Sequence, residues 1–333
     1  MSPRVSIIVP VYNAAEFVTA ALEHTATQTY QDVEIVIVDD GSRDDTAALA
    51  EAFTQREPRA RLIRMGENGG VARARHRAIQ ESRGEYFWFI DADDGWNEHA
   101  LEHLVAAADA GPCDVVVAGA RIVYDGGAGS RPIAAPESPP VDNVDAMSML
   151  LSGRITGHLW NKLFRRSLMQ RIGLVPARVH SDLAMVADAL SRARFVAFLD
   201  LEVYEYRLRS GSIITSGSRR AESLALVGDA VTEAARRASP ALVDSDEHRY
   251  FVCRYIVLSG AKDAALAPYE PAEGRRLFES MRGRITNQDL LLLARRRDVQ
   301  RLALATSARW SKPVYRGLLQ VADRWFRVRG AGV

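Results

Sequence analysis

The sequence predicts an α/β protein whose mostly parallel sheet is covered by helices and followed by a helical extension. Apolar runs of strand length alternate with stretches of helical spacing in the amino-terminal third, which is the pattern of repeated β-α units. The runs are apolar throughout, which indicates strands buried on both faces. Several are followed at once by polar residues, and ligands bind at the carboxyl ends of strands in such sheets.

The predicted elements follow one another in a regular order. The strands are buried apolar runs at Val5–Val9, Glu34–Asp39, Arg61–Arg64, Tyr86–Ile90 and Asp114–Ala118. The helices between them are Ala14–Thr25, Thr46–Arg56, Val71–Ser82 and Glu98–Ala108. Pro10 ends the first strand, and Asp44 or Asp45 can cap the helix that begins at Thr46. Helical spacing returns at Asp142–Leu151 after a loop rich in Gly and Pro.

Composition indicates a globular protein and excludes several other classes. Of the 333 residues, 47% are hydrophobic and 26% are charged, and a net charge of +1 gives no reason to expect nucleic acid as a partner. Cys113 and Cys253 are the two cysteines, which argues against a disulfide framework or a thiolate metal site. Val5–Val9 is too short for a signal peptide, and no window approaches the roughly 18 apolar residues of a membrane helix. These features predict a cytoplasmic protein.

A cluster of carboxylates follows the fourth strand. Asp91, Asp93 and Asp94 lie within four positions, and their like charges repel unless a cation or a hydrogen-bond donor neutralises them. Oxygen ligands on a short loop suit Mg²⁺ or Mn²⁺ and leave room for nucleotide phosphates, although a solvated acidic turn also fits. Two other strand ends bring polar residues to the same edge: Tyr12, Asn13, Asp39 and Asp40. Their convergence predicts a ligand site.

The turn after the first strand narrows the kind of nucleotide site. It reads Pro10-Val-Tyr-Asn-Ala, without the Gly-x-Gly-x-x-Gly pattern of dinucleotide-binding folds, and no Walker A loop occurs. NAD, FAD and P-loop chemistry are therefore disfavoured. Without a glycine-rich cradle, phosphates would be held mainly through a metal, which the acidic cluster offers.

Four motifs resemble those of the family-2 glycosyltransferases in order and spacing: Val5–Asn13, Val38–Thr46, Asn68–Arg75 and Phe89–Asp94. The resemblance implies the GT-A nucleotide-sugar-binding fold and transfer with inversion. It also implies that Pro10 and Tyr12 line the nucleoside pocket, and that Asp39 accepts a hydrogen bond from a uracil ring. Arg75 would lie near the base or the phosphates.

The same resemblance implies where metal and chemistry sit. Asp91 and Asp93 would form the family's D-x-D motif, with Asp93 the direct ligand of Mn²⁺ or Mg²⁺. Trp160 stands in an element, His158–Arg165, that lies close to the donor sugar and acceptor groove in the family, although an aromatic in an apolar helix equally fits a core position. Inversion needs a carboxylate opposite the leaving group, and Asp182 would be this base. Ser181 replaces the Glu that many relatives carry before it.

A further stretch, Tyr204–Thr215, resembles the loop that follows the catalytic region in the polysaccharide-making branch of the family. There Arg207, Arg209 and Ser212 would contact the diphosphate, while a polar surface hairpin is the alternative. The resemblance ends near residue 215, so we expect a catalytic domain at 1–215 and a helical region at 216–333.

The carboxyl-terminal region is strongly basic. Arg295–Arg329 holds ten basic residues against Asp298 and Asp323, a local charge of +8. One face of a predicted helix gathers apolar residues: Tyr315, Leu318, Leu319, Ala322, Trp325 and Phe326. Such a helix suits an anionic membrane surface, which would place the protein at the inner face of the cell membrane. Packing on the catalytic domain or across a homo-oligomer fits the pattern equally.

The sequence therefore predicts an inverting, metal-dependent glycosyltransferase that moves a hexosyl or N-acetylhexosaminyl group. A UDP-sugar is the favoured donor, and a cell-surface glycan, a teichoic-acid-type polymer or a lipid-linked precursor the favoured acceptor. A sugar nucleotidyltransferase is one alternative, but it would need a glycine-rich, arginine-containing loop after the first strand. A glycan-binding pseudoenzyme is another, and the missing Glu before Asp182 is its only support.

Overall fold

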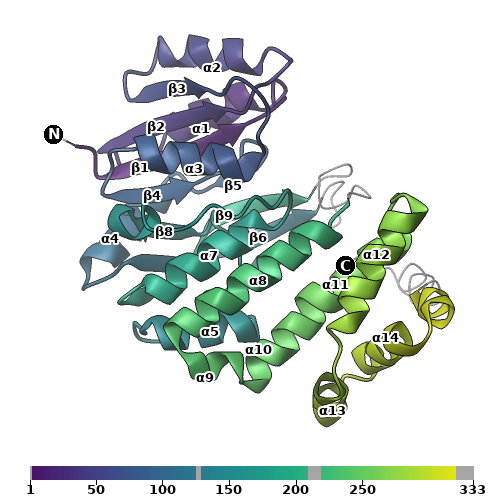
Figure 1. Ribbon diagram of the computed structural model, residues 1–333. Coiled ribbons are helices and arrows are strands. Elements are labelled where there is room, and N and C mark those ends of the chain that lie inside the picture. The colour runs from purple at the N-terminus through teal and green to yellow at the C-terminus, as the bar shows by residue number, and fades with distance from the viewer. Residues whose placement is uncertain (1, 125–128, 209–218, 320–333) are drawn as a thin grey trace.

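A computed structural model describes residues 2–124, 129–208 and 219–319, which form one mixed sheet flanked by helices and a helical region beside it (Figure 1). The strands are β1 (Val5–Val11), β2 (Val33–Asp39), β3 (Ala60–Arg64), β4 (Tyr86–Phe89), β5 (Gly95–Trp96), β6 (Val115–Tyr124), β7 (Ser130–Ile133), β8 (Lys162–Arg165) and β9 (Val196–Leu208). Their order is β3-β2-β1-β4-β8-β6-β9-β5, with β7 on β6.

Most of the sheet is parallel, as the sequence predicts. β1 lies between β2 and β4, with Ile8 opposite Val36 on one side and Phe89 on the other, and all four of the first strands run in one direction. β6 and β9 are parallel to each other over the length of β6. The short strand β8 runs antiparallel between β4 and β6, an insertion that the sequence analysis did not predict.

Helices cover both faces of the sheet because strand residues alternate between two cores. Ile7 and Val9 pack in one core with α1 (Val18–Ala26), α2 (Thr46–Thr54) and α4 (Ala100–Asp109). Ile8 packs in the other with α3 (Val71–Glu81), α5 (Asn143–Ser152), α7 (Ser181–Arg192) and α8 (Ala221–Ala238). The short α6 (Arg166–Met169) follows β8.

Several element boundaries differ from the sequence prediction. β1 continues through Pro10 to Val11, so Pro10 does not end the strand. Residues 14–17 form a turn, in which the N–H of Ala14 donates to the Thr46 hydroxyl (2.7 Å), and α1 begins at Val18 and not at Ala14. β6 extends to Tyr124, since its partner β9 is equally long. Trp160 lies in a turn before β8 and not in an apolar helix, but it is 3% exposed and packs in the core that holds α1, α2 and α4, as the alternative of a core position predicts.

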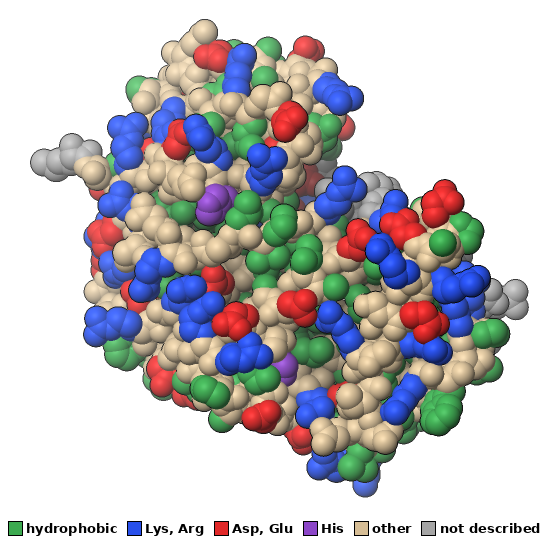
Figure 2. Space-filling view, in the orientation of Figure 1, with side chains coloured by type: hydrophobic (Ala, Val, Ile, Leu, Met, Phe, Trp, Pro, Cys, Tyr) green, Lys and Arg blue, Asp and Glu red, His purple; other side chains and the backbone are tan. Residues whose placement is uncertain are grey.

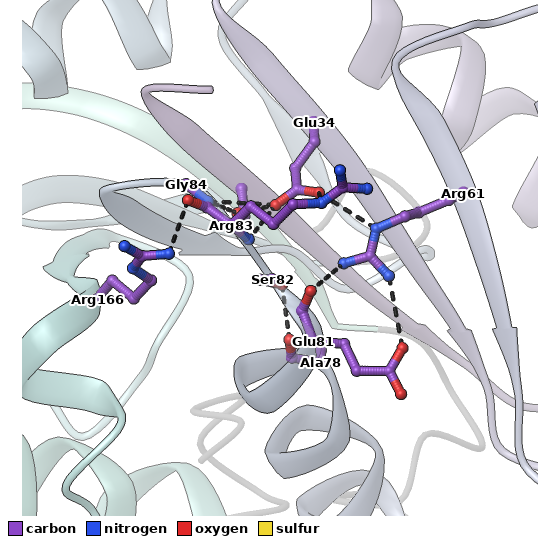
Figure 3. Close-up of polar contacts among 9 residues, drawn as sticks. Glu34, Arg61, Ala78, Glu81, Ser82, Arg83, Gly84 and Arg166 are labelled. Atoms are coloured by element: carbon purple, nitrogen blue, oxygen red, sulfur yellow. Dashed lines mark hydrogen bonds and ion pairs between the residues drawn. The ribbon is translucent and has the colours of Figure 1, made fainter. Parts of the chain in front are cut away.

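A buried carboxylate ties together the amino-terminal ends of the strands (Figure 3). Glu34 of β2 accepts from the Ser6 hydroxyl (2.6 Å), the Gly84 N–H (3.2 Å) and the Arg61 guanidinium (3.2 Å). Arg166 reaches the same place and donates to the Arg83 carbonyl at 2.9 Å. Burial alone would raise the pKa of Glu34, but its hydrogen bonds outweigh burial and lower it.

The remaining elements are α9 (Pro240–Val243), α10 (Asp246–Phe251), a π-helix η2 (Val252–Leu258), α11 (Ser259–Leu266), α12 (Pro271–Gly283), α13 (Asn287–Arg295), α14 (Val299–Trp310) and a helix at 312–319. α9 and Phe251 of α10 pack against the core that holds α5, α7 and α8, and the elements from η2 onward form a third core beside the sheet. Within the described residues no helix is long and apolar enough to cross a membrane.

The start of the basic amphipathic segment packs on the protein itself. Tyr315 is fully buried, lies 5.5 Å from the Phe278 ring and donates to the Leu258 carbonyl, and Leu319 is 5% exposed. Leu318 is 36% exposed. Ala322, Trp325 and Phe326 lie outside the described residues. The first turn of the predicted apolar face is thus occupied by the helical core.

Candidate active site

Side chains tie together the loops at the carboxyl ends of β1 and β2. The Asn13 N–H donates to the Ser42 hydroxyl, and the Arg43 N–H donates to the Asn13 side chain, both at 2.9 Å. Asp39 accepts from the Ser42 N–H at 3.2 Å. Gly41 has φ +73°, and a Cβ there would meet the Glu67 backbone at 2.8 Å, so only glycine fits.

Asp40 binds the loop before α3. The adjacent Asp39 closes the Gly41-Ser42 turn. Asp40 instead accepts from the N–H groups of Gly69 (2.8 Å) and Gly70 (2.7 Å), just before α3. The glycine pair ahead of α3 is therefore fixed to the end of β2, which sets where α3 begins.

The three residues predicted to line a nucleoside pocket occupy this edge. Pro10 lies in β1 opposite Val38, and Asp39 ends β2 with 4% of its surface exposed. Tyr12 follows β1 and is 42% exposed, unusual for so large a ring. An exposed ring beside a buried carboxylate offers a stacking surface and a hydrogen-bond acceptor to one planar ligand.

The acidic loop after β4 carries one buried carboxylate, Asp94, and two half-buried carboxylates, Asp91 and Asp93. Asp94 is buried and accepts from the Tyr204 hydroxyl (2.8 Å) and the Arg207 N–H (2.9 Å). The Asp91 N–H in turn donates to the Tyr204 oxygen at 3.0 Å. Burial, followed by the charges of Asp91 and Asp93, raises the pKa of Asp94 to about 8. Asp91 and Asp93 are half-buried at the edge of the sheet.

Asp91 and Asp93 suit a divalent cation that shares its coordination with a ligand. No three His, Cys, Asp or Glu side chains of the described part of the chain surround a position for a metal. Two carboxylates with open positions fit Mg²⁺ or Mn²⁺, which bind protein through one or two carboxylates and complete their shell with phosphates and water. The donor set therefore fits a cation bound together with a diphosphate.

Arg75 lies between the acidic loop and Asp182. Its guanidinium is 8% exposed and donates to Asp91 at 2.9 Å. Its Nε is buried and has no hydrogen-bond partner within the described residues. The same positive charge acts on Asp182 and lowers its pKa. A buried guanidinium with a spare donor suits an incoming anion.

Asp182 is the second residue of α7, two positions after His180, whose φ of +60° turns the chain into the helix. One carboxylate oxygen accepts from the Leu183 N–H at 2.9 Å, and the other lies 3.6 Å from Nδ1 of His158. Burial alone would raise its pKa. The hydrogen bond and charge of His158, with the charges of Arg75 and His180, outweigh burial and lower the pKa of Asp182 to about 2. The carboxylate is therefore ionised at neutral pH.

A column of stacked rings joins this carboxylate to the acidic loop. His158 stacks on Trp160 (4.6 Å between centroids), and Trp160 stacks on Tyr204 (4.8 Å). Tyr204 packs on Trp96 (6.1 Å), which stacks on His24 (4.8 Å). Because Tyr204 also bonds the acidic loop, the column fixes the spacing between Asp182 and Asp91.

Comparison with known proteins decides which enzyme class this geometry belongs to. The family model described as Glycosyl transferase family 2 matches residues 6–173, or 168 of the 333 residues. The chain belongs to this family. Putative glycosyltransferase EpsH of Bacillus subtilis is 29% identical over 84% of the chain and 82% of its own length. Glycosyltransferase GlyG of Streptococcus pneumoniae is 29% identical over 64% of the chain and 74% of its own length.

Two solved structures share the fold of this glycosyltransferase. S. aureus TarS 1-349, in complex with UDP-GlcNAc, superposes with a TM-score of 0.70 at 19% identity, covering 97% of this chain and 92% of that one. Mannosyltransferase PcManGT from Pyrobaculum calidifontis, in complex with GDP-Man and Mn²⁺, gives 0.55 at 20% identity, covering 97% and 87%. Both confirm the expected GT-A architecture.

Of the three predicted diphosphate contacts in Tyr204–Thr215, the structure describes Arg207. Arg207 lies in β9 and not in a loop, and its guanidinium is half exposed, 3.8 Å from Glu205. Ser212 and Arg209 lie outside the described residues.

Sequence reasoning missed several members of the glycosyltransferase site. Lys162 is fully buried and donates to the His158 carbonyl (2.7 Å) and the Asn161 side chain (2.8 Å). Its burial lowers the pKa of this amine to about 7, although the charge of Asp182 acts to raise it. His158 and Tyr204 were missed as well. The sequence could have pointed to His158 and Lys162, because both stand beside Trp160 in the motif His158–Arg165.

Proposed function

We propose that this glycosyltransferase moves a hexosyl or N-acetylhexosaminyl group, with inversion and with a divalent metal, from a UDP-sugar to a cell-surface glycan. The observation that carries the proposal is that Asp91, Arg75 and Asp182 meet at the carboxyl edge of one sheet. The complex of TarS with UDP-GlcNAc supports a uridine donor, and the complex of PcManGT with GDP-Man and Mn²⁺ supports a metal.

The donor binds across the three loops. Tyr12 stacks on the base beside Pro10, and Asp39 accepts from the ring nitrogen. The buried guanidinium of Arg75 takes the diphosphate with its free Nε. Asp91 and Asp93 would hold a divalent cation, which would supply positive charge to neutralise the leaving diphosphate. Arg207 would contact the same diphosphate by turning away from Glu205.

Asp182 accepts the proton of the acceptor hydroxyl as the new glycosidic bond forms. In the free protein its pKa of about 2 makes it a weak base. A diphosphate beside Arg75 adds negative charge next to a group that lowers this pKa, so donor binding raises the proton affinity of Asp182. His158 orients the carboxylate, and the buried Trp160 stacks on His158 and holds it in place.

The acceptor is proposed from the relatives. Putative teichuronic acid biosynthesis glycosyltransferase TuaG of Bacillus subtilis is 29% identical over 63% of the chain and 81% of its own length. We propose by analogy an acceptor used in making a surface polysaccharide, a teichoic-acid-type polymer or its lipid-linked precursor. Such acceptors place the enzyme in the cytoplasm at the inner face of the cell membrane.

The deciding experiment measures Mn²⁺-dependent release of UDP from UDP-GlcNAc and UDP-glucose. Asp182→Asn should lower turnover by about 10²–10⁴-fold while donor affinity stays within a few-fold, since only the base is removed. Asp200→Asn, an exposed carboxylate of β9, is the matched control and should turn over like the wild type. Wild-type turnover in Asp182→Asn would place the base elsewhere. Donor binding without any turnover by the wild type would favour a pseudoenzyme.

A further inference from the structure

A second site candidate lies at the opposite edge of the sheet from the acidic loop. A surface hollow of about 610 Å³ opens where β6 and β9 begin and β8 ends. Four arginines line it: Arg165, Arg171, Arg192 and Arg194. We call this hollow the arginine pocket. Figure 2 shows basic side chains gathered along the left-hand side of the molecule, where Figure 1 has β8 and the start of β1.

Two of the four arginines are neutralised by the fold. Arg165 lies 2.8 Å from Glu85 and 3.2 Å from Asp114, and it also donates to the Cys113 carbonyl. Arg192 lies 2.8 Å from Asp188, one turn before it on α7. These two pairs anchor the walls of the arginine pocket, so their guanidinium groups are held in place before any ligand arrives.

The other two arginines have no carboxylate partner among the residues that the structure describes. Arg171 and Arg194 are exposed at the rim, and their guanidinium groups make no ion pair with the described part of the chain. The nearby carboxylate Asp114 is already used by Arg165 and by the Arg194 N–H (2.8 Å). The rim therefore presents two guanidinium groups that make no ion pair with the described part of the chain.

One exposed ring adds an apolar surface to the hollow. Phe195 is 38% exposed and lines it beside the arginines, while Leu168, 1% exposed, lies beneath. An exposed ring next to guanidinium groups offers a flat apolar surface for a sugar ring and charged donors for its acidic substituent. A recessed hollow suits a discrete anionic group better than it suits the flat surface of a membrane.

α7 links this hollow to the proposed base. Asp182 lies in its first turn and Arg192 is its last residue, so ten residues at about 1.5 Å each separate them by about 15 Å. The two ends of this helix therefore place the hollow and the carboxylate within the length of a few sugar units of each other.

We propose that the arginine pocket binds a glycan chain bearing carboxylate or phosphate groups, and so holds an acidic acceptor away from the point of transfer. The identity of the ligand as a glycan rests on the proposed function, whereas its negative charge rests on the pocket alone. Arg171 and Arg194 make the ion pairs, and Phe195 packs on a sugar ring.

The test measures binding of oligogalacturonate to the full chain by calorimetry, with its uncharged methyl ester as the matched ligand. The wild type should bind the acid with an affinity that falls as salt rises, and should bind the ester at least ten-fold more weakly. Arg171→Gln/Arg194→Gln should weaken binding of the acid by ten-fold or more. Arg275→Gln/Arg297→Gln, which removes the same charge from the helical region, should not.

Donor hydrolysis measured on the same variants separates the two proposals. Arg171→Gln/Arg194→Gln should release UDP from the donor at the wild-type rate, because neither residue lies at the acidic loop. The arginine pocket proposal is wrong if the wild type does not bind oligogalacturonate, or if both double variants lose the same amount of binding affinity. Neither outcome would contradict the proposed function. If Arg171→Gln/Arg194→Gln loses binding to phosphatidylglycerol vesicles but still binds oligogalacturonate like the wild type, the arginine pocket binds lipid, and the glycan proposal is wrong.

Discussion

Lys162→Met tests whether a fully buried amine next to the proposed base is neutral or charged. Burial lowers the pKa of Lys162 from 10.5 to about 7 in the folded protein. The difference of about 3.5 pH units, at about 1.36 kcal/mol per unit, means that folding with the charged amine costs about 5 kcal/mol at or below pH 7. Methionine matches the length of the side chain and removes this cost.

The variant also loses two hydrogen bonds, which makes the pH dependence a sharper readout than the absolute stability. Leaving the His158 carbonyl and the Asn161 side chain without their donor costs about 1–3 kcal/mol each, which offsets much of the gain at pH 7. Between about pH 7 and pH 10.5 the unfolded wild-type chain binds more protons at this site than the folded one, so wild-type stability rises with pH relative to the variant.

Urea denaturation of both proteins at pH 7.5 and pH 9.0 gives the comparison. The difference in unfolding free energy, wild type minus variant, should increase by about 2 kcal/mol across this interval. Lys262→Met removes an exposed lysine, so the difference in unfolding free energy between the wild type and this variant should be the same at pH 7.5 and pH 9.0. A Lys162→Met difference that stays flat from pH 7.5 to pH 9.0 would refute the assignment of a lowered pKa to this amine.

The other predictions concern one structural carboxylate and two residues of the proposed site. Glu34→Gln should lower stability in urea by about 1–3 kcal/mol at pH 7, because it weakens hydrogen bonds from Ser6 and Gly84. The loss should shrink as pH falls below about 4.5, since the lowered pKa stabilises only the ionised form; an equal loss at pH 4 and pH 7 would contradict this. Asp93→Ala should abolish Mn²⁺-dependent UDP affinity in calorimetry while thermal unfolding stays near wild type, and unchanged affinity would exclude Asp93 as the metal ligand. His158→Gln should reduce turnover about ten-fold. It should also shift the acid limb of the activity–pH profile to higher pH, because His158 lowers the pKa of Asp182 in the wild type. An unshifted acid limb would mean that His158 has only a packing role.

The fold was predictable as far as its signals were local. β1, β2 and β4 are continuous apolar runs with polar ends, and these ends do meet at one edge of the sheet. β8 is only four residues long and begins with a lysine, so neither length nor periodicity marks it as a strand. It exists because β4 and β6 supply hydrogen bonds on both sides, and that long-range pairing has no trace in a local window.

The candidate site was likewise predictable where its signals are local, and not where it depends on contacts between distant residues. Asp91 and Asp93 stand in a motif inside residues 6–173, which the family model matches, although the match does not test their roles. Asp182 lies beyond the matched residues, so its motif stays a prediction. The contact between His158 and Asp182 joins residues 24 positions apart (182 − 158) through a turn and a helix start, so spacing could not reveal it. Asp39 and Asp40 are adjacent and chemically identical, and only the folded loops decide that one caps its own turn while the other binds Gly69 and Gly70.

The ring column gives this protein a built-in optical reporter. Trp96 and Trp160 stack on opposite sides of Tyr204, whose hydroxyl bonds the loop that carries Asp91. Both indoles are nearly buried, whereas Trp310 is 74% exposed, so their emission is shielded from quenchers in bulk solvent. A paramagnetic ion bound at the acidic loop would therefore quench the fluorescence of buried tryptophans that iodide in the solvent does not quench. Donor and metal occupancy can then be followed in unlabelled protein, with light alone.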